Sequence, residues 1–251
     1  ALKAVISVCS TTDRYADDIH YRGGCLLGEN FGWGAVMLSY SSRPPDPMLR
    51  PDWREMWLER LEAEPWLAPH WAALQERGAY WQHGSICEDY ARLQVPVLIW
   101  GGWADSYMNT VAAIAENLPG AKGIVGPWVH QYPHTAVPGP AIGFLQEAVR
   151  WWDRWLKGKD NGAESDPAYR AYMLHSEAPN ASPKHRAGHW VAEAAWPSPR
   201  VTRKVLGLSP ATQRPEGVTH TGPHVAYLSQ DEGAAISCQI ATPQHLGMNA
   251  G

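Results

Sequence analysis

Apolar residues follow two alternating patterns along the first part of the chain. Three short apolar runs have the length and β-branched content of buried strands, and they cover residues 2–8, 95–102 and 121–125. Two longer segments, residues 107–117 and 143–157, repeat their apolar residues at helical spacing. Alternating strands and helices are typical of a parallel sheet with crossover helices, so the pattern predicts an α/β fold.

A long insertion, residues 19–90, separates the first two predicted strands. Its residues 53–64 carry apolar side chains at positions i, i+3, i+4 and i+8, which predicts a helix, and residues 69–78 predict a second, short helix. Residues 23–34 are rich in glycine and are expected to be irregular. Residues 46–51 contain prolines and predict a turn or linker. We therefore expect a helical, Trp-rich insertion without strands of quality.

The pattern changes again after residue 162. Short strand candidates follow one another with turns rich in Pro, Gly and Ser between them and no helix, which is typical of a β-sandwich. We therefore predict a domain boundary at residues 161–166. The strand candidates are residues 171–174, 189–191, 204–206 and 224–228.

Composition narrows the classes of function. The chain has 251 residues, of which 45% are hydrophobic and 18% charged, so a packed core is expected. The formal net charge of −4 leaves no basic surplus to neutralise phosphates, which argues against nucleic-acid binding. No apolar run approaches the ~18 residues that a membrane span needs, so we expect no membrane insertion.

The cysteines and the first residues bear on the compartment. Cys9, Cys25, Cys87 and Cys238 are scattered and form no C-x-x-C pair, which favours reduced thiols and argues against a zinc ribbon. Residues 1–6 lack the charged head and long apolar stretch of a signal peptide. We therefore predict a cytoplasmic protein, and we leave a homo-oligomer open.

Two polar residues follow successive predicted strands. Asp105 ends the segment at residues 100–105 (WGGWAD), and His130 ends the segment at residues 126–130 (GPWVH). Functional residues of open parallel sheets gather at the carboxyl ends of strands. An acid followed by a histidine matches the second half of a Ser-Asp-His triad in α/β-hydrolase order. The alternatives are that Asp105 caps the following helix and that His130 is a turn residue.

Several motifs resemble one hydrolase family. They are similar to the cocaine-esterase-like (CocE/NonD) hydrolases, which belong to the X-Pro dipeptidyl-peptidase group of α/β hydrolases. The resemblance covers essentially the whole chain, and its acid and histidine motifs arrive together and in order. The matching segments are residues 102–105 (GWAD), 126–130 (GPWVH), 138–144 (PGPAIGF), 151–158 (WWDRWLKG), 191–193 (VAE) and 196–199 (WPSP).

The resemblance implies roles for these residues. Asp105 would be the acid of the triad and His130 the general base, and the reaction would cleave an ester or amide through an acyl-enzyme. The substrate would be a small ester or amide or a short peptide, with no cofactor and no metal. Trp103 and Trp128 flank the two motifs and either line the substrate pocket or pack the loops.

The resemblance also implies a division of the chain. Residues 1–18 and 91–163 would form part of the α/β-hydrolase core, the carboxyl half of its parallel sheet. Residues 19–90 would be a helical cap, and residues 164–251 would begin a carboxyl-terminal β-sandwich (jelly-roll) domain.

One departure from the family is serious. The nucleophile elbow G-x-S-x-G is absent from the sequence. Residues 84–87 (GSIC) have a glycine only before the serine, Ser10 lacks the glycine pair, and Ser106 stands beside the acid. We therefore expect an internal fragment of a longer serine hydrolase that carries the acid and the base without the nucleophile and is inactive alone. The alternatives are a binding protein that holds a peptide or carbohydrate on its Trp-rich surface, and a non-catalytic subunit.

The other histidines predict no metal site. His130 and His134 are four residues apart, a spacing that serves a metal only on a helix, and Pro133 lies between them.

Overall fold

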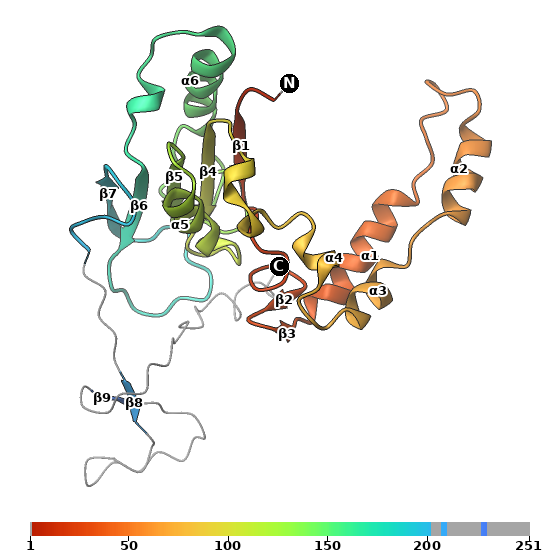
Figure 1. The fold of residues 1–251 in the computed structure, drawn as a ribbon, viewed down its shortest axis with the longest axis horizontal. Coiled ribbons are helices and arrows are strands. Elements are labelled where there is room, and N and C mark those ends of the chain that lie inside the picture. The colour runs from red at the N-terminus through yellow and green to blue at the C-terminus, as the bar shows by residue number, and fades with distance from the viewer. Residues whose placement is uncertain (1, 202–206, 210–226, 230–251) are drawn as a thin grey trace. The chain divides into compact units, whose positions relative to one another are not determined.

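The computed structural model describes residues 2–201, 207–209 and 227–229 (Figure 1). These residues fall into two compact units that divide between Trp196 and Pro197. The first unit holds the sheet and the helical insertion. In the second unit, β8 (Gly207–Ser209) and β9 (Tyr227–Ser229) form an antiparallel pair.

A five-stranded, mostly parallel sheet organises the first unit. Its order is β1-β4-β5-β6-β7, and only β7 runs antiparallel to its neighbour. This arrangement confirms the predicted α/β fold. The strands are β1 (Val5–Val8), β4 (Val97–Gly102), β5 (Lys122–Gly126), β6 (Tyr169–Leu174) and β7 (Gly188–Glu193).

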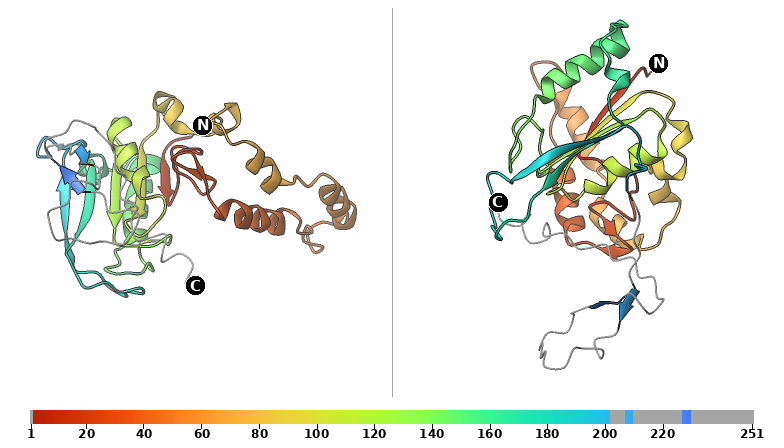
Figure 2. Two further views of the ribbon diagram at one scale, coloured as in Figure 1. Left: turned by 90° about the horizontal axis from the view of Figure 1, so that it is seen from below. Right: turned by 90° about the vertical axis from the view of Figure 1, so that its left-hand side faces the viewer.

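Helices cover both faces of this sheet (Figure 2). Helix α5 (Met108–Asn117) packs on the face that contains Val97 and Ile99. Helix α6 (Phe144–Lys157) packs on the opposite face, which contains Leu98 and Trp100. Successive strand residues point to opposite faces, so a strand between two layers of helices must be apolar on both sides, as the run in β4 is.

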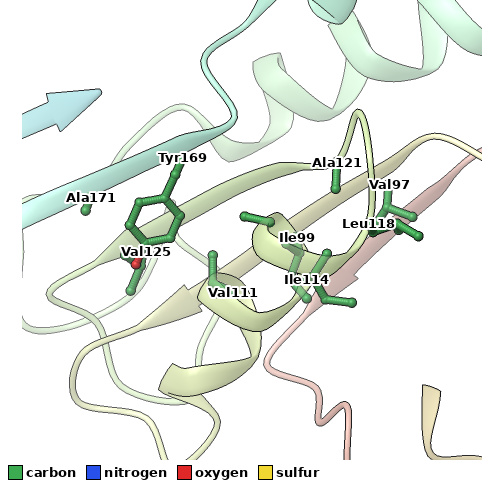
Figure 3. Packing of buried hydrophobic residues seen from close by; sticks show 10 residues of the cluster. Val97, Ile99, Val111, Ile114, Leu118, Ala121, Val125, Tyr169 and Ala171 are labelled. Atoms are coloured by element: carbon green, nitrogen blue, oxygen red, sulfur yellow. The ribbon is translucent and has the colours of Figure 1, made fainter. Parts of the chain in front are cut away.

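Glycines let α5 approach the strands closely. A Cβ added at Gly101 would lie 2.7 Å from Val111 Cγ2, and one added at Gly123 would lie 2.9 Å from Val111 Cγ1. Val111 and Ile114 therefore reach the sheet surface, as Figure 3 shows. Burying an aliphatic side chain in this way contributes roughly 1.5–3 kcal/mol. Strands β4 and β5 are buried along their whole length. This packing holds the carboxyl ends of the two strands in place.

The sheet continues beyond the boundary expected at residues 161–166. Strands β6 and β7 cover the first two strand candidates of the expected sandwich, but β6 pairs with β5 in parallel and β7 pairs with β6. Residues 204–206 lie outside the described residues, and β9 overlaps the candidate at 224–228. Local pattern predicts that a segment is a strand but not which sheet it joins, because pairing is a long-range property. The sandwich at the end of the chain stays a prediction.

The insertion is largely helical, as expected, and contains two helices that the sequence did not predict, the long α1 (Glu29–Ser41) and the one-turn α4 (Ala79–Gln82). Residues 23–34 were expected to be irregular, but α1 begins at Glu29. Gly34 allows α1 to pack closely on α3, because a Cβ added at Gly34 would lie only 2.6 Å from Ala68 Cβ on α3. The elements of the insertion are β2 (Tyr21–Arg22), β3 (Cys25–Leu26), α1 (Glu29–Ser41), α2 (Trp53–Glu62), α3 (Leu67–Ala73), α4 (Ala79–Gln82) and two short 3-10 turns at Ile86–Glu88 and Tyr90–Arg92.

A small aromatic core holds the base of the insertion together. Tyr21, Trp71 and Trp81 are buried there, with ring centroids of Tyr21 and Trp81 5.4 Å apart. No helix in the described part of the chain is long and apolar enough to cross a membrane.

Candidate functional site

The site lies where β4 and β5 end. Asp105 follows β4 in a tight loop in which its N–H donates to the carbonyl of Gly102 at 3.1 Å. His130 lies in the loop after β5. The two strands are parallel neighbours, so both loops emerge at the same edge of the sheet.

Backbone hydrogen bonds join the two loops directly. Trp103 N–H donates to the carbonyl of Gly126 at 2.8 Å, and Ala104 N–H donates to the carbonyl of Trp128 at 3.0 Å. Glycine is required at the end of β4, because a Cβ at Gly102 would lie 1.9 Å from the carbonyl oxygen of Trp128. The glycine of the GWAD motif thus allows the loops to touch, and the glycine of GPWVH leaves room for the Trp128 ring of its own loop.

Asp105 and His130 form a hydrogen-bonded pair. His130 Nδ1 lies 3.1 Å from each carboxylate oxygen of Asp105. The carboxylate is fully buried, and it also accepts the backbone N–H of Tyr107 at 3.1 Å. The His130 side chain is 55% exposed, and within the described residues its Nε2 makes no hydrogen bond. The ring therefore turns one nitrogen to the acid and leaves the other free.

The pair shifts the pKa of both partners. Burial by itself would raise the pKa of Asp105, but the hydrogen bond from His130 and the smaller contributions of Cys9 and Tyr107 hold that pKa below its usual value. The hydrogen bond to Asp105 raises the pKa of His130, against the opposing effect of burial. The acid is thus charged at neutral pH, and it strengthens the basicity of the ring.

Cys9 lies beside the pair of Asp105 and His130, and the sequence analysis did not predict this position. It directly follows β1, and its φ of 51° places it in the left-handed region, where the described chain has no other non-glycine residue. Its Sγ and one polar atom each of Asp105 and His130 lie within 4.8 Å of one another. Burial and the nearby Asp105 carboxylate raise the pKa of the Cys9 thiol. Its position after a strand, like that of Asp105 and His130, was the signal that could have identified it.

Polar groups at the junction between the sheet and the insertion lie beside the pair. The Tyr107 ring lies 5.5 Å from the His130 ring, centroid to centroid, and the Tyr107 hydroxyl donates to Asp18 Oδ1 at 2.9 Å. Arg22 donates to the carbonyl of Ser106 and forms an ion pair with Asp17. The base of the insertion is therefore tied to the loop that carries Asp105.

The two flanking tryptophans mainly hold the loops. Trp128 is 1% exposed, and its Nε1–H donates to the carbonyl of Pro140 at 2.8 Å. Trp103 is half-buried, and its Nε1–H donates to the carbonyl of Tyr172 at 2.6 Å. These contacts favour the packing alternative, and the role in substrate binding stays a prediction for both.

The other residues weighed from the sequence lie as follows. The hydroxyls of Ser10 and Ser7 bond to each other at 2.6 Å, and the Ser85 hydroxyl is buried in the insertion. Ser106 Oγ is 3.5 Å from Asp105 Oδ1, beside the acid as expected. His134 stacks on Phe144 with ring centroids 5.6 Å apart, and residues 130–134 are not helical, so no helix presents His134 together with His130.

Comparison with known proteins agrees with the motif resemblance. Cocaine esterase from Rhodococcus sp. (strain MB1 Bresler) is 25% identical over 148 residues, which are 54% of this chain and 24% of that protein. A crystal structure of a CocE/NonD family hydrolase from Staphylococcus aureus covers 83% of this chain with a TM-score of 0.57 and 15% identity. A second structure of that hydrolase gives a TM-score of 0.51 with 13% identity.

The matched relatives are much longer than this chain. The chain spans about a quarter of cocaine esterase (24%) and about a third (33%) of the S. aureus hydrolase. The family described as X-Pro dipeptidyl-peptidase (S15 family) matches residues 1–132, which include both Asp105 and His130. The expected relationship to the CocE/NonD hydrolases is confirmed, and the chain belongs to the X-Pro dipeptidyl-peptidase (S15) family of serine hydrolases.

Proposed function

We propose that Asp105 and His130 are the acid and the general base of a serine hydrolase whose nucleophile is contributed by residues outside these 251. The reaction is the cleavage of an ester or amide through an acyl-enzyme. The observation that carries the proposal is the geometry of the pair, with Nδ1 on the buried carboxylate and Nε2 free.

Each partner has one task in this mechanism. Neutral His130 accepts the serine proton on Nε2 as the hydroxyl oxygen attacks the carbonyl carbon, and it later returns that proton to the leaving group. Asp105 fixes the proton of the neutral ring on Nδ1 and stabilises the imidazolium that forms. The buried position of Asp105 and its bond from the N–H of Tyr107 keep the carboxylate charged and oriented for this task.

Without a nucleophile, the 251-residue chain is inactive as a hydrolase. Loss of the serine costs roughly a million-fold in rate in a well-characterised triad. The sequence offers no G-x-S-x-G, and Ser106 stands on the carboxylate side of the pair.

The substrate class follows from the family. We propose a small ester or amide, including a short peptide, which approaches His130 from its exposed side. Residues 19–90 are proposed as the cap beside this approach, because Arg22 of the insertion and Asp18 directly before it contact the acid loop. Trp103 and Trp128 are proposed to act by holding the two loops in place.

Labelling with a fluorophosphonate, read by intact mass, tests the proposal. The probe bonds to activated serines, so we expect no adduct on the folded 251-residue chain. We expect one adduct on the product of the whole reading frame that contains it, and that adduct should disappear in His130→Ala. An adduct on the short chain that depends on His130 would contradict the external nucleophile. Labelling of the long product that survives His130→Ala would contradict the role of the pair.

A further inference from the structure

The cluster formed by Cys9, Asp105 and His130 combines three metal-ligand types at one point. We propose that it binds Zn²⁺ through Cys9 Sγ, a carboxylate oxygen of Asp105 and Nδ1 of His130. The three residues come from loops after β1, β4 and β5, which are adjacent strands of one sheet. Parallel strands bring these loops together although the residues are far apart in sequence.

The separations suit a tetrahedral ion. With Zn–N and Zn–O bonds near 2.0–2.1 Å, two such ligands at a tetrahedral angle lie about 3.3 Å apart. His130 Nδ1 and the Asp105 oxygens are 3.1 Å apart, which is close to that edge. A sulfur ligand needs about 3.6 Å to each of the other two, given a Zn–S bond near 2.3 Å. The three atoms already lie within 4.8 Å of one another, so Cys9 moves by about 1 Å at most.

The ligand types select the metal. A thiolate and an imidazole suit Zn²⁺, whereas Mg²⁺ and Ca²⁺ require oxygen ligands in larger number. One thiolate and one carboxylate neutralise the two charges of the ion, which matters because Asp105 is fully buried. The fourth ligand would be water or a solute, and the 55% exposure of the His130 side chain gives the ion access from solvent.

Binding exchanges protons without any redox change. As the Zn–S bond forms, the Cys9 thiol releases its proton to solvent. His130 binds the ion as neutral imidazole, so the ring proton moves from Nδ1 to Nε2. One neutral thiol and one Zn²⁺ thus give one zinc thiolate and one free proton.

This inference deepens the proposed function, on which its regulatory part rests. Zn²⁺ bound to Asp105 and Nδ1 replaces the hydrogen bond between the acid and the base, and the proton on Nε2 prevents that nitrogen from accepting another. A bound zinc therefore switches off the acid–base pair. Zinc binding itself depends only on the three side chains.

A cobalt titration tests the site. Co²⁺ replaces Zn²⁺ and gives a thiolate-to-cobalt charge-transfer absorption, which reports a cysteine ligand. We expect the reduced 251-residue chain to bind one equivalent with this absorption and to release it to Zn²⁺ but not to Mg²⁺. In Cys9→Ser the absorption should vanish. In His130→Ala the affinity should fall by at least about 10-fold, the lower limit for loss of even an outer-shell partner.

Two control variants address the competing groups on the surface. Cys25→Ser removes an exposed thiol, and His175→Ala breaks an exposed pair in which His175 Nε2 lies 3.0 Å from His189 Nδ1. Both should leave the charge-transfer absorption unchanged. Far-UV circular dichroism checks the fold of every variant, and His130→Ala is expected to fold because that side chain is half-exposed. Absence of binding by the unmodified chain, or equal absorption in Cys9→Ser, overturns the zinc site.

Failure of the zinc site and failure of the proposed function are distinguishable. Coupling of His130 to Asp105 is measured in metal-free protein with a chelator present. If that coupling exists but Co²⁺ does not bind, only the zinc site is rejected. In the product of the whole reading frame, the ratio of esterase rates without and with Zn²⁺ should fall toward one in Cys9→Ser.

Discussion

Helices α5 and α1 are both rich in apolar residues, but their surroundings differ. In α5, Val111 and Ile114 are 1% and 4% exposed because they lie against strands on which glycines leave room. In α1, Phe31 and Tyr40 are 76% and 59% exposed, and the helix packs mainly on α3. The sheet therefore fixes its loops through dense packing, whereas the outer insertion depends on few contacts. The candidate site lies on loops of the densely packed sheet, and this packing holds Asp105 and His130 in hydrogen-bonding position.

The largest expected effect is the loss of stability when a buried tryptophan beside the sheet is removed, compared with an exposed tryptophan of the insertion. Trp128→Ala removes a side chain that is 1% exposed and hydrogen-bonded to Pro140, and it should lower the free energy of unfolding by about 3–5 kcal/mol. Trp66→Ala in the insertion removes a side chain that is 79% exposed, and it should change the free energy of unfolding by less than about 0.5 kcal/mol. Urea unfolding measures both. Similar losses for the two variants would remove the contrast between the regions.

Glycine substitutions should give a smaller effect of opposite sign in the two regions. Gly102→Ala places a Cβ 1.9 Å from the carbonyl of Trp128, so it should destabilise by about 1–3 kcal/mol. Gly32→Ala in α1 meets no atom within 4 Å and should stabilise by up to about 1 kcal/mol, because glycine costs helix entropy. Thermal and urea unfolding provide the measurement.

A third glycine provides the internal control for this pair. Gly34 is also in α1, but its Cβ would lie 2.6 Å from Ala68 Cβ. Gly34→Ala should therefore destabilise although Gly32→Ala does not. Equal behaviour of Gly32→Ala and Gly34→Ala would contradict the packing of α1 on α3.

Ion pairs should give the smallest effect, and it depends on pH. Glu147 on α6 pairs with Arg170 on β6 and with Arg150. Burial would raise the pKa of Glu147, but these two arginines hold it below its usual value. A lowered pKa in the folded state adds stability above the ordinary Glu pKa of about 4.3, and this stability is lost as the pH falls further.

The Glu147→Gln variant tests that dependence. The partners are partly exposed, so the variant should lose less than about 1 kcal/mol at pH 7, and the difference should be smaller at pH 3, below the ordinary Glu pKa. Asp52→Asn breaks an exposed pair with Arg50 in the insertion and serves as the control without a measurable change. Urea unfolding at the two pH values is the measurement, and a Glu147→Gln difference independent of pH would contradict the ionic origin.

The same contrast explains what the sequence could predict. Strands β4 and β5 and helices α5 and α6 were predicted within two residues of their bounds, because continuous apolar runs and helical periodicity are local signals. Helix α1 was missed because its glycines argue against a helix, and the reason for Gly34 lies on α3.

The sequence could not predict which strands pair with one another or which further residues lie beside Asp105 and His130. The membership of β6 and β7 in the main sheet depends on hydrogen bonds to β5 rather than on local pattern. Asp105 and His130 were predicted because both follow strands and stand in recognisable motifs. Cys9 also follows a strand but has no motif. Tyr107 contacts the pair through its backbone N–H, which donates to Asp105, and through its ring beside His130, and neither contact has a sequence signal.

The pKa of His130 in the metal-free chain tests the central claim most directly. An NMR titration of the ring protons, with a chelator present, gives this pKa in the unmodified protein and in Asp105→Asn. We predict a value above the ordinary 6.5 in the unmodified protein and a fall to 6.5 or below in the variant, where burial remains and the carboxylate charge is gone. A pKa of His130 that is ordinary in the unmodified protein, or unchanged in Asp105→Asn, would contradict the acid–base pair.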